Sequence, residues 1–393
     1  MYFPPEVGAP QVRLLALAQQ LQKRGHQVDI VTAMPNYPTG VIFEGYRGRG
    51  LLRESVGGVS VTRTWLYPAA GDNLFKRLFS YLSFTATALY GSLSNPAPDY
   101  FVVESPPLFL GLTGVVAGFL RRRPYVFNVS DLWPASAKEM GLISNRALLG
   151  LAEMLERFLY RRARRVSVQT DGIRDAVAQI VGVDRTLPLP NGVDTELFRP
   201  DVPPCGPAGE VRFIYAGTHG YAQGLDVLLD AAEQLAAEPA IAIVLVGDGP
   251  DKARLVEAAR SRGLGNVRFL DSRPVEEMPP IFTGARASLV PLRDLPLFRG
   301  ARPSKVLPSL SCATPVIFSG KGEAAQLITE SGAGLVVPPE DATALAGAMR
   351  TLAGDAALAA EMGANGRRLA VATFSWEAIV GRWLEALVAG KQR

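Results

Sequence analysis

One stretch of this sequence gathers cationic side chains in front of a glycine-rich loop. Arg299, Arg302 and Lys305 precede a short apolar segment, and Gly322 and Glu323 open a later helix-like run. Backbone N–H groups at a helix start, together with nearby cations, form a site for a phosphate. A carboxylate such as Glu323 accepts hydrogen bonds from two neighbouring hydroxyls, as on a ribose. The set suits a nucleotide diphosphate, although a helix–strand–helix unit with a solvated basic face fits the same residues.

A second glycine-rich loop follows an apolar run at residues 211–215. It contains Gly217, His219 and Gly220 and precedes an expected helix at residues 225–236. Glycine lets the backbone come close to a phosphate. His219 either contacts such a ligand or is a loop histidine that faces water.

Two further candidate positions lie in the first half of the chain. Asp131 follows an expected strand at residues 125–129, and α/β folds place ligand chemistry just past strand ends. It could equally cap the next helix. Glu6 and Gly8 lie in a loop before an expected helix at residues 11–24, where a ligand would approach, but a plain loop of turn-forming residues fits as well.

Those candidates lie on alternating strands and helices that predict a two-domain α/β protein. A chain of 393 residues is too long for one ordinary core, and its loop–helix–strand order is typical of doubly wound sheets. Turn-rich segments at residues 187–194 and 201–209 mark the boundary between domains. We therefore expect domains at residues 1–190 and 191–375, followed by a terminal helix at residues 376–393.

The composition excludes several classes of protein. The formal net charge of +4 is too small to indicate a nucleic-acid partner without a basic patch. Two distant cysteines and two histidines indicate neither a disulfide framework nor a metal site, so a reducing cytoplasm is expected. The first residues have neither a basic nor an apolar signal-peptide region, and no signal peptide is expected.

A long apolar segment at residues 74–93 carries several aromatic residues. Ser and Thr interrupt it and charges precede it, so it is a poor membrane span. It is either a buried core helix or a cationic amphipathic helix on a membrane surface. The arginines at 121–123 and 157–165 either form solvated faces or meet anionic lipid headgroups.

Motifs along nearly the whole chain resemble the retaining glycosyltransferases of family 4, which have the GT-B fold. The matching segments are FPPEVGAPQ, LAQQLQKRGHQVDIVT, LPNGVDTELFRP, YAGTHGYAQGLD, VLVGDGP, NVRFL, PSKVLPSLSCATPVI, GAGLVVPPED and FSWEAIVGRWLE. The segments DLWP, AQGL and PSK are similar to the subgroup typified by WbuB, which adds deoxyamino sugars during bacterial surface-polysaccharide assembly.

The resemblance implies two Rossmann-like domains that flank a cleft, with the last helix returning to the first domain. It implies transfer of an N-acetylated deoxyhexose from a UDP-sugar to a lipid-linked acceptor in O-antigen or related polysaccharide assembly. The reaction would need no metal and no cofactor, because cations stabilise the leaving diphosphate. The enzyme would work in the cytoplasm, peripherally on the inner membrane surface.

The resemblance also assigns roles to individual residues. The first domain would bind the acceptor through Glu6, Gly8 and Pro10. Asp131 and Glu323 would be catalytic. The donor would be bound by Gly217, His219, Gly220, Arg273, Arg302, Lys305, Gly322, Glu323 and Gln326.

Several positions depart from the family pattern. The family's two Glu residues, eight positions apart, correspond to Gly300 and Pro308. The usual Lys of the diphosphate loop is Gln223, and the usual first-domain His is Ser130. The departures at Gly300 and Pro308 leave open a relative that binds nucleotide sugars without catalysis. A UDP-sugar epimerase, which has a similar two-domain fold, is a further alternative.

Family members also carry an apolar strand just before the FPPE motif. Here that motif begins at Phe3, after only Met1 and Tyr2. We therefore expect the natural reading frame to begin upstream, and a gap or a collapsed pairing in the first sheet beside the strand at residues 28–32, because a missing central strand leaves its neighbours unpaired.

Overall fold

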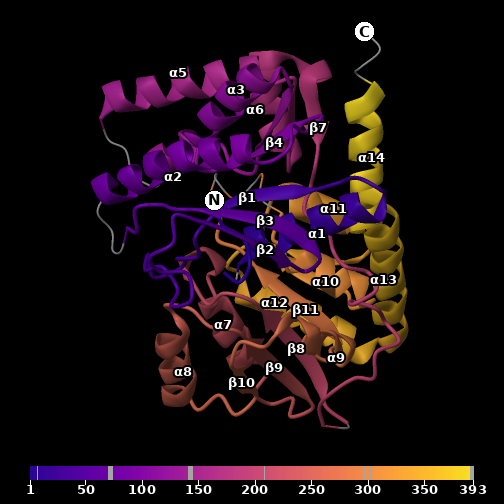
Figure 1. The fold of residues 1–393 in the computed structure, drawn as a ribbon. Coiled ribbons are helices and arrows are strands. Elements are labelled where there is room, and N and C mark those ends of the chain that lie inside the picture. Colours follow the sequence, from indigo (N-terminus) through magenta and orange to yellow (C-terminus); the bar gives the residue numbers. More distant parts are fainter. Residues whose placement is uncertain are drawn as a thin grey trace. The chain divides into compact units, whose positions relative to one another are not determined.

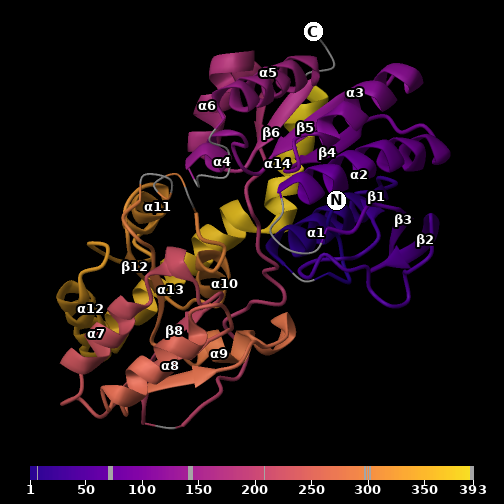
Figure 2. The same ribbon diagram turned by 90° about the vertical axis from the view of Figure 1, so that its left-hand side faces the viewer.

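The computed structural model describes residues 1–6, 8–69, 74–139, 145–207, 209–295, 298, 300 and 302–389. Its chain forms two compact α/β units (Figures 1 and 2). The first unit comprises Met1–Asn191 and the chain from Ile379 on, and the second comprises Gly192–Ala378.

The first unit alternates strands and helices. Its strands are β1 (Asp29–Ala33), β2 (Leu51–Val56), β3 (Val59–Thr64), β4 (Phe101–Ser105), β5 (Tyr125–Val129), β6 (Arg165–Val168) and β7 (Thr186–Pro188). Its helices are α1 (Ala9–Lys23), α2 (Leu74–Ser94), α3 (Leu110–Arg121), α4 (Ala135–Glu139), α5 (Arg146–Arg162) and α6 (Asp171–Val181). Thr170, rather than Asp171, caps α6, because its side chain accepts a hydrogen bond from the Ile173 N–H.

The strands of the first unit form two separate sheets, in the orders β1-β3-β2 and β4-β5-β6-β7. The second sheet is parallel throughout. Within the described ranges, β1 pairs with β3 alone, and the Met1 carbonyl accepts hydrogen bonds from the Ala33 N–H and the Thr32 hydroxyl. The expected gap beside the strand at residues 28–32 is thus confirmed for this part of the chain.

The hairpin of β2 and β3 was not predicted as two strands. Gly57 and Gly58 connect them and both have positive φ, at 58° and 83°. Two consecutive positive φ angles characterise the tight hairpin turn that matches strand twist. The Gly-Gly pair was the available signal in the sequence.

Helices α2, α3 and α5 form a neighbouring set in the first unit, because α3 contacts both α2 and α5 (Figure 1). Phe84 and Ala88 of α2 are buried, which agrees with the core-helix interpretation for that side of the helix. The opposite side is exposed, with Phe75 at 81% and Phe79 at 56%. None of the helices within the described ranges is both long and apolar enough to span a bilayer.

The last helix, α14 (Trp376–Ala389), packs on the parallel sheet of the first unit. Its buried Trp383 donates a hydrogen bond from Nε1 to the hydroxyl of Ser167 in β6, at 2.8 Å. A buried indole N–H needs such a partner, so the contact fixes the register of α14 on the sheet.

The second unit contains one parallel six-stranded sheet in the order β10-β9-β8-β11-β12-β13. Its strands are β8 (Val211–Ala216), β9 (Ile241–Val246), β10 (Val267–Leu270), β11 (Ala287–Pro291), β12 (Val316–Ser319) and β13 (Gly334–Val337). Its α-helices are α7 (Asp226–Gln234), α8 (Lys252–Ser261), α9 (Pro279–Thr283), α10 (Val306–Ser311), α11 (Glu323–Ser331), α12 (Ala342–Gly354) and α13 (Ala356–Leu369).

Apolar side chains cover both faces of this sheet. On one face, Leu228 of α7, Leu255 of α8 and Met349 of α12 share a core with Leu245 of β9. On the other face, Leu310 of α10 packs with residues of α9 and α11. A sheet buried on both faces explains the continuous apolar strands of this half of the sequence, such as IAIVLV in β9.

Candidate functional site

The strand order of the second unit predicts where a ligand binds. Chain order reverses between β8 and β11, which pair side by side, and ligands of such sheets bind outside the carboxyl ends of the strands at that point. The segments that follow β8 and β11 are Gly217–Gly224 and residues 292–295. We call the first of these the β8 loop.

The β8 loop lies so close to the loop after β9 that only glycine fits at position 247. A Cβ on Gly247 would lie 2.0 Å from the Gly217 carbonyl oxygen, and Gly247 has a φ of 144°. Gly217 itself has a φ of 143°, and its N–H donates to the Val246 carbonyl at 2.9 Å. The glycines predicted for phosphate approach therefore also hold the two loops against each other.

Lys305 lies beside the start of the β8 loop. Its ammonium donates a hydrogen bond to the Tyr215 hydroxyl at 2.8 Å and lies 4.2 Å from the centroid of the Tyr215 ring. Its Cε would be 3.0 Å from a Cβ on Gly217. Within the described part of the chain, Lys305 has no carboxylate partner. Burial lowers its pKa to about 7, because desolvation penalises the charged form.

His219 is fully buried, so the interpretation as a water-facing loop histidine is wrong. Its ring lies near Tyr215 and Phe269, at centroid distances of 5.7 and 6.2 Å. Neither ring nitrogen has a hydrogen-bond partner among the described residues. Burial lowers the pKa of His219, and the charge of Lys252 lowers it further. Nitrogens left unpaired in this way are available to a ligand or a water molecule.

Arg302 and Glu323 form a second charged group in this unit. Their Nη2 and Oε2 atoms are 3.5 Å apart, and both side chains are largely buried. The Arg302 guanidinium also lies 5.1 Å from the centroid of the Phe374 ring. Glu323 is the first residue of α11, behind Gly322 with a φ of 90°, where a carboxylate also stabilises the helix dipole. A Cβ on Gly300 would lie 4.0 Å from the Glu323 Oε1.

The other predicted donor residues have their own local partners. Arg273 pairs with Glu277 on the surface at 3.4 Å, and the Gln326 amide donates to Glu330 at 2.7 Å. Gly220 lies in the β8 loop, where a Cβ would be 3.2 Å from Oε1 of Gln223. The structure thus forms two groups of predicted residues. The first surrounds Tyr215 and contains Gly217, His219 and Lys305. The second contains Arg302, Gly322 and Glu323. Arg299 lies outside the described residues.

In the first unit, Glu6 is a buried anchor of its loop. Its carboxylate accepts hydrogen bonds from the backbone N–H groups of Phe3, Asn36 and Tyr37, at 3.0, 2.8 and 2.8 Å. Gly8 precedes α1, and Pro10 lies in the first turn of that helix. The Glu6 carboxylate is therefore engaged by backbone groups of its own segment and of residues 36–37.

Asp131 follows β5 and is partly exposed. Its Oδ1 accepts a hydrogen bond from the Ser136 hydroxyl at 2.6 Å, so it contacts the next helix through a side chain rather than a backbone N–H. The neighbouring Ser130 hydroxyl lies in a polar cluster, accepting from Arg13 at 2.8 Å and donating to Glu104. Arg13 also pairs with Glu104.

Comparison with known proteins identifies the two units. Residues 8–192 match the family model described as "Glycosyl transferase 4-like domain", and residues 210–355 match "Glycosyl transferases group 1". The chain is a glycosyltransferase of the GT-B fold.

Named glycosyltransferases are similar over most of their length. The 2-deoxystreptamine N-acetyl-D-glucosaminyltransferase of Streptomyces fradiae is 28% identical, over 90% of this chain and 84% of that protein. The O-antigen chain mannosyltransferase C of Escherichia coli is 25% identical, over 93% and 90% respectively. The solved structure of Anabaena Alr3699/HepE with UDP and glucose has a TM-score of 0.70 at 18% identity, covering 98% of each chain.

Two residues of the candidate site were not singled out in the sequence. Tyr215 supports the Lys305 ammonium, and its hydroxyl donates to the Thr218 carbonyl at 2.5 Å. Arg293, two residues past β11, contacts the far end of the β8 loop through the Tyr221 carbonyl at 2.7 Å. A charged residue just past a strand end was the available signal for Arg293. Tyr215 lies inside a strand, and nothing in the sequence pattern marked it as a site residue.

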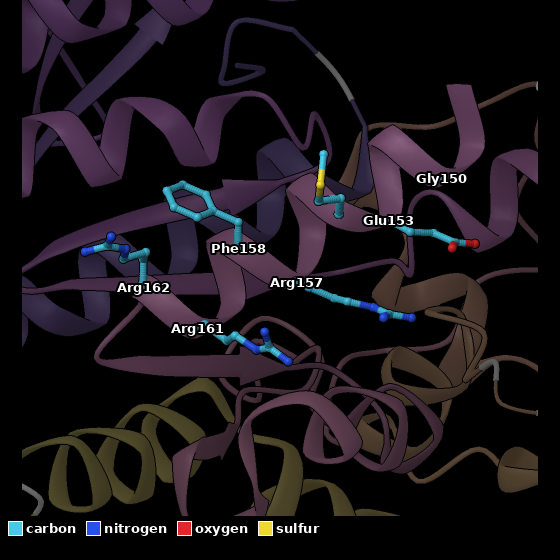
Figure 3. Close-up of a pocket in the computed structure, with 7 residues that line it drawn as sticks. Gly150, Glu153, Arg157, Phe158, Arg161 and Arg162 are labelled. Carbon is cyan, nitrogen blue, oxygen red and sulfur yellow. The ribbon is translucent and has the colours of Figure 1, made fainter. Parts of the chain in front are cut away.

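Two surface hollows lie in the first unit of the glycosyltransferase. One is lined by Met154, Arg157, Phe158 and Arg161 of α5, together with neighbouring residues of that helix. Figure 3 shows that the Phe158 side chain points away from those of Arg157 and Arg161. A second hollow, at the end of α3, is lined by Phe119, Leu120, Arg122, Arg123 and adjacent residues. Both combine arginines with apolar groups.

Proposed function

We propose that this glycosyltransferase moves a sugar from a UDP-sugar to a lipid-linked acceptor in bacterial surface-polysaccharide assembly, with retention of anomeric configuration. The sugar is an N-acetylated deoxyhexose, as in the subgroup typified by WbuB. The observation that carries the proposal is the Lys305 ammonium, which lies beside Gly217 at the switch point without a carboxylate partner in the described chain. UDP bound to the similar Anabaena protein supports the choice of nucleotide.

Lys305 would neutralise charge on the leaving diphosphate. In the transfer, the bond between the anomeric carbon and a diphosphate oxygen breaks, and a bond to the acceptor oxygen forms. UDP leaves with the bonding pair, and the acceptor hydroxyl loses its proton. Because negative charge builds on the diphosphate, a cation fixed beside it stabilises the transition state. Lys305 and Arg302 would supply this charge in place of a metal ion, so EDTA should leave turnover unchanged.

Glu323 would act on the hydroxyls of the donor. The position where the family carries its first Glu is Gly300, which has no side chain, and a Cβ there would lie 4.0 Å from the Glu323 Oε1. The carboxylate that relatives supply from that position is therefore available from the start of α11. Arg302 would orient the Glu323 carboxylate through their 3.5 Å contact.

The first unit would bind the acceptor. Glu6 accepts three backbone hydrogen bonds, which would anchor one end of the acceptor-binding set Glu6, Gly8 and Pro10. Asp131 would accept the proton of the acceptor hydroxyl or orient it, since its carboxylate is partly exposed just past β5. Both roles follow from the strand-end position and the family resemblance.

The neighbouring helices α2, α3 and α5 would rest on the cytoplasmic face of the inner membrane. They expose Phe75 and Phe79, Phe119 and Leu120, and Leu151 and Met154 respectively. Arginines 122 and 123 at the end of α3, and 157 and 161 on α5, are also exposed. Apolar groups beside arginines suit the boundary between acyl chains and anionic headgroups.

A thermal-shift series with nucleotide sugars tests the donor, because a ligand that binds only the folded state raises the melting temperature. UDP-N-acetyl sugars should raise it more than GDP-sugars. Release of UDP that depends on added acceptor supports transfer, whereas release without acceptor supports an epimerase. Binding without any release supports a relative that has lost catalysis, which the absence of side-chain carboxylates at Gly300 and Pro308 would favour.

A further inference from the structure

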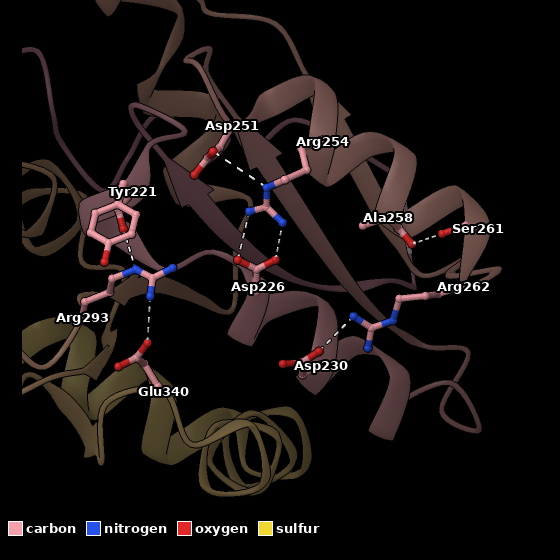
Figure 4. Close-up of polar contacts among 10 residues, drawn as sticks. All are labelled: Tyr221, Asp226, Asp230, Asp251, Arg254, Ala258, Ser261, Arg262, Arg293 and Glu340. Carbon is pink, nitrogen blue, oxygen red and sulfur yellow. Dashed lines mark hydrogen bonds and ion pairs between the residues drawn. The ribbon is translucent and has the colours of Figure 1, made fainter.

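Arg293 fastens the far end of the β8 loop to the end of β11 (Figure 4). Its backbone N–H donates to the Ala222 carbonyl at 3.1 Å, and its Nε donates to the Tyr221 carbonyl at 2.7 Å. Its guanidinium lies 4.3 Å from the centroid of the Tyr221 ring, although that residue is 67% exposed. Lys305 therefore lies beside the start of the β8 loop, and Arg293 fastens its end.

The fit between Arg293 and the loop depends on Gly224. This residue is in the left-handed conformation with a φ of 57°, and a Cβ there would lie 3.1 Å from the Arg293 Cγ. Arg293 thus packs directly beside the position that follows Gln223. By the family resemblance, the position of Gln223 corresponds to the lysine of the diphosphate loop. An arginine from the segment after β11 therefore lies next to the place where that lysine is absent.

Part of the Arg293 guanidinium remains available. Nη1 is 3.3 Å from Glu340 Oε1 in a half-exposed pair, which contributes little binding energy in water. Nη2 has no hydrogen-bond partner among the residues that the structure describes. The neighbouring Arg254 differs, because both of its terminal nitrogens pair with the Asp226 carboxylate, at 2.7 and 2.9 Å (Figure 4). This pairing is the main reason why the pKa of Asp226 is lowered.

We propose that Arg293 supplies the diphosphate-binding charge that Gln223 lacks, while its contacts with Tyr221 keep the β8 loop in its binding conformation. This inference rests on the proposed function, since it concerns the same nucleotide diphosphate. It adds a residue that reaches the site from β11 rather than from the loop itself.

The test moves the positive charge from position 293 to position 223 and measures the affinities for UDP and for pyrophosphate by calorimetry. Arg293→Met should weaken both ligands about ten- to a hundred-fold, the range for one lost charged hydrogen bond. Adding Gln223→Lys to that variant should restore most of the affinity, because it returns the charge to the adjacent position. Arg254→Met, the matched control, should leave both affinities unchanged.

The variant Tyr221→Ala separates the effect of the Arg293 charge from the effect of the contact between Arg293 and the Tyr221 ring. It removes the ring beneath the guanidinium but keeps the cation, so it should weaken UDP less than Arg293→Met does. Unchanged affinity in Arg293→Met overturns the proposal, and so does failure of Gln223→Lys to rescue a folded Arg293→Met, which would leave Arg293 a purely structural role. If the wild-type protein binds neither UDP nor pyrophosphate, the proposed function itself is wrong.

Discussion

The ammonium of Lys305 lies 2.8 Å from the hydroxyl of Tyr215 and 4.2 Å from the centre of its ring, with no carboxylate partner among the described residues. A buried lysine whose partners are a phenol and an aromatic face gains little compensation for lost hydration. Its charged form is therefore unfavourable until an anion arrives. This arrangement connects the protonation of Lys305 with both stability and ligand binding.

The stability of the protein should depend on pH through Lys305. Its pKa is about 7 in the folded state and 10.5 ordinarily, so between these values the unfolded chain binds one more proton. The free energy of unfolding then rises with pH in this window. Compared with Lys305→Met, the wild type should gain thermal stability from pH 7 upward, as measured by calorimetry. Parallel profiles for the two proteins would contradict the assignment.

Binding of UDP should take up a proton above pH 7. A diphosphate favours the charged form of Lys305, so the affinity should fall as the pH rises above about 7, by at most about tenfold per unit. Calorimetry in buffers of different ionisation enthalpy measures this uptake. Lys305→Arg keeps the charge at every pH and should remove the dependence. If Lys305→Arg instead reproduces the wild-type pH profile, another group is responsible.

Gly247→Ala should damage the donor site and the fold together. The positive φ of 144° alone costs a non-glycine residue about 1–3 kcal/mol, and the added Cβ would meet the Gly217 carbonyl at 2.0 Å. Gly265→Ala is the control, since nothing lies within 4 Å of a Cβ there. Urea unfolding should separate the two variants clearly. Equal stability would mean that the β8 and β9 loops are not in contact.

Asp131→Asn should abolish transfer and leave UDP affinity unchanged, because the residue lies in the first unit and the proposed UDP site in the second. Asp171→Asn is a suitable control, since Asp171 is an exposed carboxylate in the first turn of α6. Turnover is measured with a labelled UDP-sugar and a lipid-linked acceptor. Full activity of Asp131→Asn would remove this residue from the mechanism.

Binding to anionic vesicles should weaken as salt is added, because salt screens the headgroup charge from α3 and α5. Reversing Arg157 and Arg161 to Glu should each reduce binding by about 1 kcal/mol or more. The control is Arg260→Glu, an exposed arginine on α8 of the second unit. Co-sedimentation with vesicles measures the effect. Vesicle binding that does not change with salt concentration would contradict a membrane role for α5. So would an equal loss of vesicle binding in Arg260→Glu.

Much of the fold follows from local sequence pattern. The strand at 125–129 is observed with the predicted bounds, because buried parallel strands form continuous apolar runs. The boundary near residue 190 follows from turn-forming residues. By contrast, β7 and β13 were not predicted, since each has three or four residues and too short a pattern to recognise.

The candidate site was harder to predict, because its contacts join residues that are distant in sequence. Lys305 and Gly217 were both chosen, but their shared partner Tyr215 is an ordinary strand residue in sequence. Glu6 was chosen for its position before a helix start, yet its carboxylate accepts a hydrogen bond from the backbone N–H of Asn36, 30 residues away. Side-chain chemistry can be read from the sequence, whereas its use depends on tertiary neighbours.

The most direct test of the account is the affinity of UDP for the wild type and for Lys305→Met, measured by isothermal titration calorimetry at pH 6.5. At this pH Lys305 is mostly protonated, because its pKa is about 7. We expect the wild type to bind UDP and Lys305→Met to bind it about ten- to a hundred-fold more weakly, with a melting temperature no lower than that of the wild type. Equal affinity in the two proteins, or no binding of UDP to the wild type, would contradict the account.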